Sequence, residues 1–167
     1  DITKLDQLIE IGILSLEEVT GPQPRYSEFM PTSVTLYPTT KCNLRCVYCY
    51  GEAGDTPIID LDLCIGNDAI DLVVENAMRL GKKQMILGYH GIGEPTMNWS
   101  LIVETTKHAQ KSIKDVGIKL ISHIVTNGTF SKSKLDWLIN NNFDITLSFD
   151  GPKDIQDSQR PFANGTG

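Results

Sequence analysis

The chain has 167 residues, of which 40% are hydrophobic and 22% are charged, so it is long enough to form one domain with a buried core. Its formal net charge of −6 argues against broad binding to a nucleic-acid backbone, which needs clustered lysine and arginine. No apolar run approaches the roughly 20 residues that span a bilayer. We see no secretory leader either, so we expect a cytoplasmic protein without a membrane partner.

Hydrophobic periodicity predicts alternating strands and helices that follow a peripheral N-terminal segment. We expect residues 1–32 to form a short helix over 3–11 and a Pro-rich linker, and residues 33–167 to form the main domain. The elements predicted in this domain are, in chain order, a strand at 34–37, a helix at 62–80, a strand at 85–89, a helix at 98–114, a strand at 119–125, a helix with Ser133 and Asp136 in capping-box spacing, and a strand at 145–149.

Repeated strand–helix units predict an α/β fold with a parallel sheet and right-handed crossovers. In such sheets ligands bind beyond the carboxyl ends of the strands. Four loops of unusual composition lie there: the cysteines after the first strand, Gly-Ile-Gly-Glu-Pro after the second, Thr-Asn-Gly after the third and Asp-Gly-Pro after the fourth. The four loops therefore predict a single active site at this edge of the sheet.

Cys42, Cys46 and Cys49 stand in a CxxxCxxC spacing within eight residues. A structural zinc site needs four Cys or His ligands, usually in two pairs, and the three histidines show no paired spacing. The remaining cysteine, Cys64, is expected to be a buried thiol rather than a fourth ligand. Three cysteines crowded together also do not form a disulfide framework. An iron–sulfur cluster with one iron left open is the chemistry that this spacing favours.

The cysteine spacing, together with Gly-Ile-Gly-Glu-Pro one strand–helix unit later, resembles the radical S-adenosylmethionine (radical SAM) superfamily. The resemblance implies that Cys42, Cys46 and Cys49 hold a [4Fe-4S] cluster whose fourth iron binds S-adenosylmethionine. It also implies a partial (β/α) barrel, of which residues 33–167 supply about four parallel strands with outer helices. The later strands of the barrel and its catalytic acid or base lie outside this segment, so no catalytic residue is assigned.

The resemblance implies contacts to S-adenosylmethionine as well. The residues at matching positions are Tyr48, Gly93, Glu94, Pro95, Ser148 and Arg160. The backbone carbonyls and the carboxylate of the glycine-glutamate-proline loop would accept hydrogen bonds from the ammonium group. The tyrosine would pack near adenine, the serine hydroxyl would meet the ribose, and the arginine would bind the methionine carboxylate. Each position also has a plainer interpretation as a turn, a packing contact or a solvated side chain. Asn127 is expected to shape a turn, and His90 to be structural.

Several stretches together resemble one branch of the superfamily most: Tyr-Pro-Thr-Thr-Lys-Cys-Asn-Leu-Arg-Cys, His-Gly-Ile-Gly-Glu-Pro-Thr, Thr-Asn-Gly-Thr and Ser-Phe-Asp-Gly-Pro. This branch holds the anaerobic sulfatase-maturating enzymes and the SPASM-type peptide maturases. The resemblance implies an oxidoreductase that reductively cleaves S-adenosylmethionine to a 5′-deoxyadenosyl radical, which oxidises or crosslinks a side chain of a peptide or protein. The electron would come from a low-potential donor such as ferredoxin or flavodoxin.

Two alternatives stay open. The glutamate-proline loop is also similar to that of RNA-modifying radical SAM enzymes, although the acidic charge argues against an RNA surface. The chain begins at Asp1 and ends at Gly167 without a closing element, so we expect a piece of a larger protein. Such a piece could bind a cluster without catalysing a reaction, and its open sheet edge would favour pairing or aggregation. Iron content per chain separates this alternative from the enzymatic ones.

Overall fold

The computed structural model describes residues 6, 9, 29–54 and 56–166. Its elements, in order, are β1 (Ser33–Leu36), α2 (Leu63–Arg79), β2 (Gln84–Tyr89), the 3-10 helix η1 (Pro95–Asn98), α3 (Trp99–Ser112), β3 (Lys119–Thr126), α4 (Lys132–Asn140), β4 (Phe143–Leu147) and α5 (Lys153–Gln159). The helix expected over 3–11 lies outside the described residues, apart from Asp6 and Ile9. The boundary between residues 1–32 and 33–167 therefore stays a prediction.

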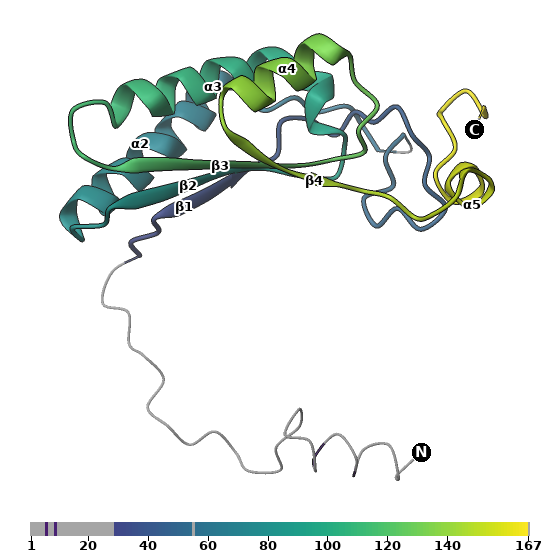
Figure 1. Ribbon diagram of the computed structural model, residues 1–167, viewed down its shortest axis with the longest axis horizontal. Helices are drawn as coiled ribbons and strands as arrows, with labels where there is room; N and C mark the ends of the chain where they lie inside the picture. Colours follow the sequence, from purple (N-terminus) through teal and green to yellow (C-terminus); the bar gives the residue numbers. More distant parts are fainter. Residues whose placement is uncertain (1–5, 7–8, 10–28, 55, 167) are drawn as a thin grey trace.

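The four strands form one parallel sheet in the order β1-β2-β3-β4. Helices α2, α3 and α4 cover one face of this sheet, while the described residues place no helix over the opposite face (Figure 1). The α/β fold class predicted from the sequence is confirmed, and the barrel is open within this segment. Because all four strands are parallel, their carboxyl ends meet at one edge, where the long loops and α5 gather.

Helix α2 shows how local sequence sets the element boundaries. The Asp62 side chain caps its start by accepting hydrogen bonds from the backbone N–H groups of Cys64 and Ile65 at 2.8 and 3.4 Å. Gly81, at a φ of 61°, follows its end in the left-handed region that glycine adopts easily. The predicted inward residues of α2 are buried: Ile70, Val73, Val74 and Ala77.

The prediction of a buried Cys64 is wrong, since this thiol is exposed. Cys64 lies six residues before Ile70, which turns it about 120° around the helix from the face that meets the sheet. The apolar stripe of the helix already excluded the thiol from the core.

The core under α3 is closed by a buried tyrosine. Tyr89, at the end of β2, is fully buried, and its hydroxyl lies 2.8 Å from the hydroxyls of both Thr105 and Thr106. Burial raises the pKa of Tyr89 to about 12. These hydrogen bonds satisfy a phenol that would otherwise be unpaired in the core, and they join α3 to the strand that leads into the glycine loop.

Three further features differ from the sequence prediction. The last strand, expected at 145–149, is β4 at Phe143–Leu147, so Ser148 follows the strand instead of lying in it. Helix α4 begins at Lys132 with Ser131 as its N-cap, so the capping box expected from Ser133 and Asp136 does not start it; Asp136 instead accepts a hydrogen bond from Lys132 Nζ at 2.8 Å. Helix α5 was not predicted, because none of its seven residues is buried and its sequence carries no apolar stripe. None of the described helices is long and apolar enough to cross a membrane.

Candidate functional site

A cleft of about 150 Å³, open to solvent, lies at the carboxyl ends of the strands. All nine residues that the sequence predicted as ligands or cofactor contacts line it: Cys42, Cys46, Tyr48, Cys49, Gly93, Glu94, Pro95, Ser148 and Arg160. They come from the loops after β1, β2 and β4 and from the end of α5. The structure therefore brings the predicted residues together, while their roles toward a cofactor stay predictions.

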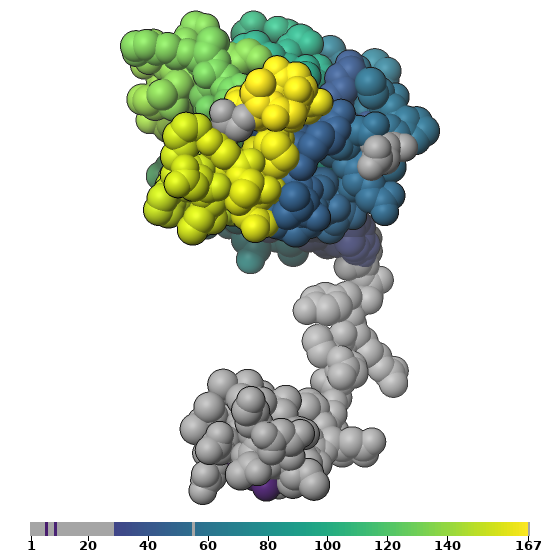
Figure 2. Space-filling model, turned by 90° about the vertical axis from the view of Figure 1, so that its right-hand side faces the viewer, coloured from purple at the N-terminus to yellow at the C-terminus, as the bar shows by residue number. Residues whose placement is uncertain are grey.

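The end of the chain holds the cysteine loop on one side. The backbone N–H groups of Arg45 and Val47 donate to the carbonyls of Pro161 and Gln159 at 2.8 and 2.9 Å, and Leu44 forms an isolated bridge with Phe162. Figure 2 shows this contact on the surface, where the C-terminal residues in yellow lie against the cysteine segment in blue. The unpredicted α5 segment therefore forms a wall of the site.

On its other side the cysteine loop is held by Asp60. This carboxylate accepts hydrogen bonds from Thr39 Oγ1 at 2.5 Å and from Lys41 Nζ at 2.7 Å, and the contact with the lysine, followed by that with the threonine, lowers the pKa of Asp60. Thr39 and Lys41 lie just before Cys42. The first cysteine is therefore anchored by residues that lie far along the loop.

The glycine loop contacts the base of the cysteine loop directly. A Cβ atom on Gly93 would lie 2.2 Å from the Lys41 carbonyl oxygen and 2.6 Å from that of Thr39. The next residue, Glu94, donates its backbone N–H to the same Lys41 carbonyl at 2.7 Å. Glycine is therefore required here by the neighbouring backbone of this chain, in addition to any approach of a ligand.

Glu94 is 3% exposed and accepts four hydrogen bonds from its own chain. Its Oε1 accepts from the backbone N–H and hydroxyl of Thr96, at 3.1 and 2.7 Å, and from the Thr126 hydroxyl at 2.7 Å. Its Oε2 accepts from the Asn127 backbone N–H at 2.8 Å. The carboxylate therefore joins the glycine loop, the start of η1 and the end of β3, whatever ligand lies in the cleft.

The three thiols lie in different surroundings. Burial raises the pKa of Cys42, whose sulfur accepts from the Leu44 backbone N–H at 3.5 Å and from Asn127 Nδ2 at 3.9 Å. The sulfur of Cys46 accepts from Arg160 Nε at 3.4 Å. Among the described residues, no three His, Cys, Asp or Glu side chains converge closely enough to bind one metal ion. The thiols are thus spread around the cleft wall.

Tyr48 and Ser148 are positioned by contacts with the ends of β3 and β4. The hydroxyl of Tyr48 donates to the Asp150 carboxylate, and this hydrogen bond raises the pKa of the tyrosine. The ring remains about half exposed, at 55% for the residue. Ser148 is fixed by its backbone N–H, which donates to the Thr126 carbonyl at 2.9 Å. Both side chains are therefore available to a ligand in the cleft.

Sequence reasoning missed part of the role of Asn127, which was expected only to shape a turn. Its Oδ1 does accept from the Thr129 backbone N–H at 2.9 Å, but its Nδ2 also donates to Asn43 Oδ1, 84 residues away, at 2.9 Å. The Thr-Asn-Gly-Thr stretch was the available signal for such a contact. His90 is half-buried and lines the cleft, with its ring centroid 6.0 Å from that of Tyr37.

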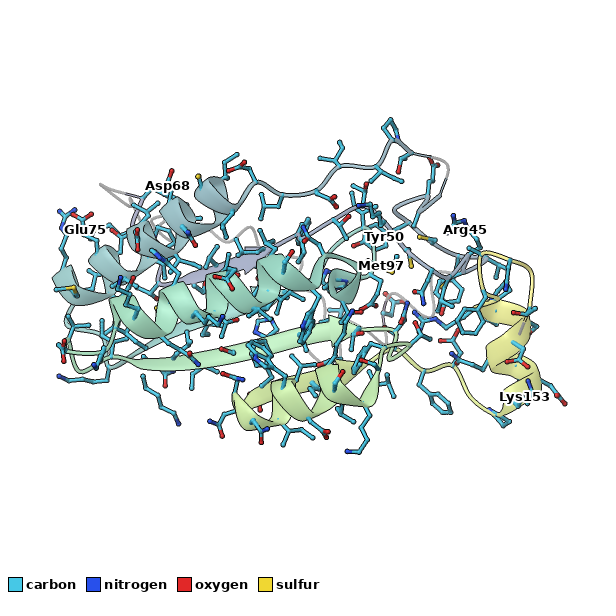
Figure 3. All side chains as sticks on the ribbon, turned by 90° about the horizontal axis from the view of Figure 1, so that it is seen from above. Arg45, Tyr50, Asp68, Glu75, Met97 and Lys153 are labelled. Carbon is cyan, nitrogen blue, oxygen red and sulfur yellow. The ribbon has the colours of Figure 1, made fainter. Side chains whose placement is uncertain are left out.

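Figure 3 separates the site from the rest of the surface. Tyr50, Arg45 and Met97 lie among the loops at the carboxyl ends of the strands, whereas Asp68 and Glu75 project from α2 at the far end. His108, another histidine without a predicted partner, lies on α3 and contacts Asp71 at 2.7 Å, outside the cleft.

A parallel α/β sheet thus carries three cysteines and a glycine-glutamate loop at its carboxyl edge. The chain belongs to the radical SAM superfamily, whose family model matches residues 36–166. The family prediction is thereby confirmed.

Curated relatives extend this finding. The chain is 27% identical over 133 residues to a cysteine-type anaerobic sulfatase-maturating enzyme of Clostridium perfringens, and the match covers 78% of the chain and 36% of the relative. It is 36% identical over 118 residues to a GTP 3′,8-cyclase of Lactiplantibacillus plantarum, covering 69% of the chain and 31% of that relative. The chain thus spans about a third of the length of these proteins.

Solved structures support the fold. The structure of native anSMEcpe with bound AdoMet and Kp18Cys peptide has a TM-score of 0.69 and is 24% identical, and the match covers 80% of this chain and 36% of the other. A tagged form of anSMEcpe with bound AdoMet, also 24% identical, gives a TM-score of 0.67 over 81% of this chain and 36% of the other. The sheet described above thus has the fold of about a third of each of these solved chains.

Proposed function

We propose that this chain forms the cofactor-binding part of a radical SAM enzyme, in which Cys42, Cys46 and Cys49 hold a [4Fe-4S] cluster beside S-adenosylmethionine. The observation that supports this most is the convergence of all nine predicted residues on one cleft. They lie up to 118 positions apart in the sequence, between Cys42 and Arg160, so the fold rather than local spacing unites them. Residues 33–167 would be the radical SAM part of the protein.

The residues present fit such a cluster. Cysteine thiolates are the usual ligands of iron–sulfur clusters, and three of them leave one iron open. A cluster binds each thiolate to a different iron, so its ligands must surround a cavity rather than meet at one ion, which agrees with the spread of the three thiols. When bound, the cluster supplies the electron that cleaves S-adenosylmethionine and yields the radical used on the substrate.

The side chains of the cleft have distinct binding tasks in this proposal. Arg160 uses Nε for the Cys46 sulfur, and its two terminal nitrogens can bind the methionine carboxylate as a fork. Tyr48, held by Asp150, offers its ring to adenine, and Ser148 offers its hydroxyl to the ribose. The Gly93–Pro95 loop accepts the ammonium group through its backbone carbonyls, while the Glu94 carboxylate keeps that loop in place.

We further infer that the whole protein is an oxidoreductase of the SPASM-type maturase branch that modifies a side chain of a peptide or protein. The sulfatase-maturating relatives and the peptide bound in a solved neighbour support this substrate class. The GTP 3′,8-cyclase relative covers 69% of the chain and the sulfatase-maturating relative 78%, so the two matches overlap. We infer that the overlapping part carries what these proteins share, and we expect substrate contacts elsewhere. A low-potential carrier such as ferredoxin or flavodoxin would supply the electron.

Product analysis tests this proposal. The protein is reconstituted with iron and sulfide without oxygen, reduced with dithionite and incubated with S-adenosylmethionine, with or without a cysteine-containing peptide. We expect 5′-deoxyadenosine and methionine to form, and a modified peptide to be detected by mass spectrometry. A Cys46→Ala variant should form neither product. Cleavage stimulated by GTP but not by any peptide would overturn the substrate class, and no cleavage at all would overturn the proposal for this chain.

A further inference from the structure

A closed ring of side-chain hydrogen bonds lies beside the first cysteine. Asn43 Nδ2 donates to Thr129 Oγ1 at 2.6 Å, Thr129 Oγ1 donates to Asn127 Oδ1 at 2.6 Å, and Asn127 Nδ2 donates to Asn43 Oδ1 at 2.9 Å. The ring joins the residue after Cys42 to the turn after β3. Two loops far apart in the sequence are therefore held in one fixed relation.

The ring also fixes which way the Asn127 amide points. Its Oδ1 accepts from the Thr129 backbone N–H at 2.9 Å, and a backbone N–H can only donate. The oxygen must therefore face Thr129, and the Nδ2 group must face the cysteine loop. The nitrogen lies 2.9 Å from Asn43 Oδ1 and 3.9 Å from the Cys42 sulfur, and its two hydrogens allow it to donate to both. The side of the Asn127 amide that faces the cysteine loop is therefore its hydrogen-bond donor.

The backbone of the same residue is fixed by Glu94. Glu94 Oε2 accepts the Asn127 N–H at 2.8 Å, while Oε1 is occupied by Thr96 and Thr126. The carboxylate is buried, so losing one of its partners would leave an unsatisfied charge that water cannot easily reach. A path of hydrogen bonds thus leads from the glycine loop, through the turn after β3, to the first cysteine.

We propose that Asn127 is a positioning residue that donates an amide hydrogen bond to the Cys42 sulfur, and that Glu94 acts on the cluster through it. The inference rests on the proposed function, since it concerns the ligand of the same cluster. Hydrogen bonds to cluster sulfurs stabilise the more negative, reduced state and so raise the reduction potential. Glu94 belongs to the loop that would hold the ammonium group of S-adenosylmethionine, and through Asn127 it would also affect the reduction potential of the cluster.

The readout is the ratio of reduced to oxidised cluster at a fixed solution potential, measured by EPR on the anaerobically reconstituted protein. One hydrogen bond to sulfur is worth enough to change this ratio about two- to tenfold. We expect Asn127→Ala and Asn127→Asp to lower the ratio, because the first lacks the donor and the second replaces it with a negatively charged acceptor. Asn127→Asp retains an oxygen for the Thr129 N–H, so it remains informative if Asn127→Ala does not fold.

Matched controls separate the donor role from a general loosening of the loops. Thr129→Val removes the hydroxyl from the ring but leaves the Thr129 N–H and the Asn127 donor, so the ratio should stay near that of the unaltered protein. Glu94→Gln should lower the ratio. Thr96→Val, which removes one contact of the other carboxylate oxygen and leaves the turn at Asn127 intact, should not.

The outcomes distinguish this inference from the function on which it rests. An unaltered protein that binds no cluster would overturn the proposed function itself. A cluster in the unaltered protein, with a ratio unchanged in Asn127→Ala and Asn127→Asp, would overturn only the donor role of Asn127. Equal shifts in Thr129→Val and Asn127→Asp would also overturn it, because they would show that the ring matters and the donor does not.

Discussion

Replacement of Gly93 by alanine is the sharpest test of how the two loops of the site fit together. The added Cβ would lie 2.2 Å from the Lys41 carbonyl oxygen, whereas real Cβ contacts essentially never fall below 3.0 Å. The carbonyl would have to move by at least 0.8 Å, and it belongs to the residue just before Cys42. The movement would also strain the 2.7 Å hydrogen bond from the Glu94 N–H.

The size of the effect follows from these contacts. Forcing an extra methyl group into a closely packed position costs about 1–3 kcal/mol, and weakening one buried hydrogen bond adds about 1 kcal/mol. We therefore expect Gly93→Ala to lower the free energy of unfolding by roughly 2–4 kcal/mol, as measured by urea denaturation of the apoprotein. The variant should also bind less iron, because its first cysteine is displaced.

Gly117→Ala is the matched control. Gly117 has a φ of 68°, and a Cβ there would meet nothing within 4 Å, so the substitution introduces backbone strain of about 1–2 kcal/mol without a collision. Iron content should be unchanged in this variant. If Gly93→Ala were as stable as the unaltered protein and bound as much iron, the direct contact between the glycine loop and the cysteine loop would be refuted.

Three further outcomes are expected. Burial raises the pKa of Tyr89 from 10.0 to about 12, so between these pH values the folded protein retains a proton that the unfolded chain loses. The free energy of unfolding should therefore fall as pH rises from 10 toward 12, by up to about 1.4 kcal/mol per pH unit. Urea denaturation at several pH values should show a shallower fall for Tyr89→Phe, and equal slopes would contradict the pKa shift. Cys64→Ser should retain the iron content of the unaltered protein, whereas Cys49→Ser should lose it, and a loss in both would mean that the exposed thiol is a ligand. Arg160→Lys keeps the charge but not the fork, so equilibrium dialysis of the reconstituted protein should show about tenfold weaker binding of S-adenosylmethionine; unchanged binding would remove the arginine from the site.

The sheet and its covering helices could be predicted because buried apolar residues recur at regular intervals along strands and helices. In β2, Met85, Leu87 and Tyr89 are fully buried beneath the helices, and the matching stripe of α2 is equally regular. Helix α5 has no buried residue, so it left no comparable pattern. The end of α5 and the residues after it contact the cysteine loop, more than 100 positions earlier, and local sequence carries no pattern for such a contact.

The members of the site were predictable, but their partners were not. The cysteine spacing and the glycine loop can be recognised from a short stretch of sequence, and all of the residues predicted from them line the cleft. The partners of Glu94 and Asn127, in contrast, lie up to 85 residues away and depend on which strands are neighbours. Local sequence indicated a turn at Asn127, and only the parallel register of β2 and β3 places that turn beside the first cysteine.

The central claim is that the three thiols of this cleft hold a cluster with an open iron that binds S-adenosylmethionine. It is tested most directly by EPR of the anaerobically reconstituted, reduced protein, recorded with and without S-adenosylmethionine, alongside the iron content. We expect about four irons per chain and a cluster signal that shifts when S-adenosylmethionine is added. A cluster signal that is unchanged by S-adenosylmethionine, or a protein that retains no iron, would contradict it.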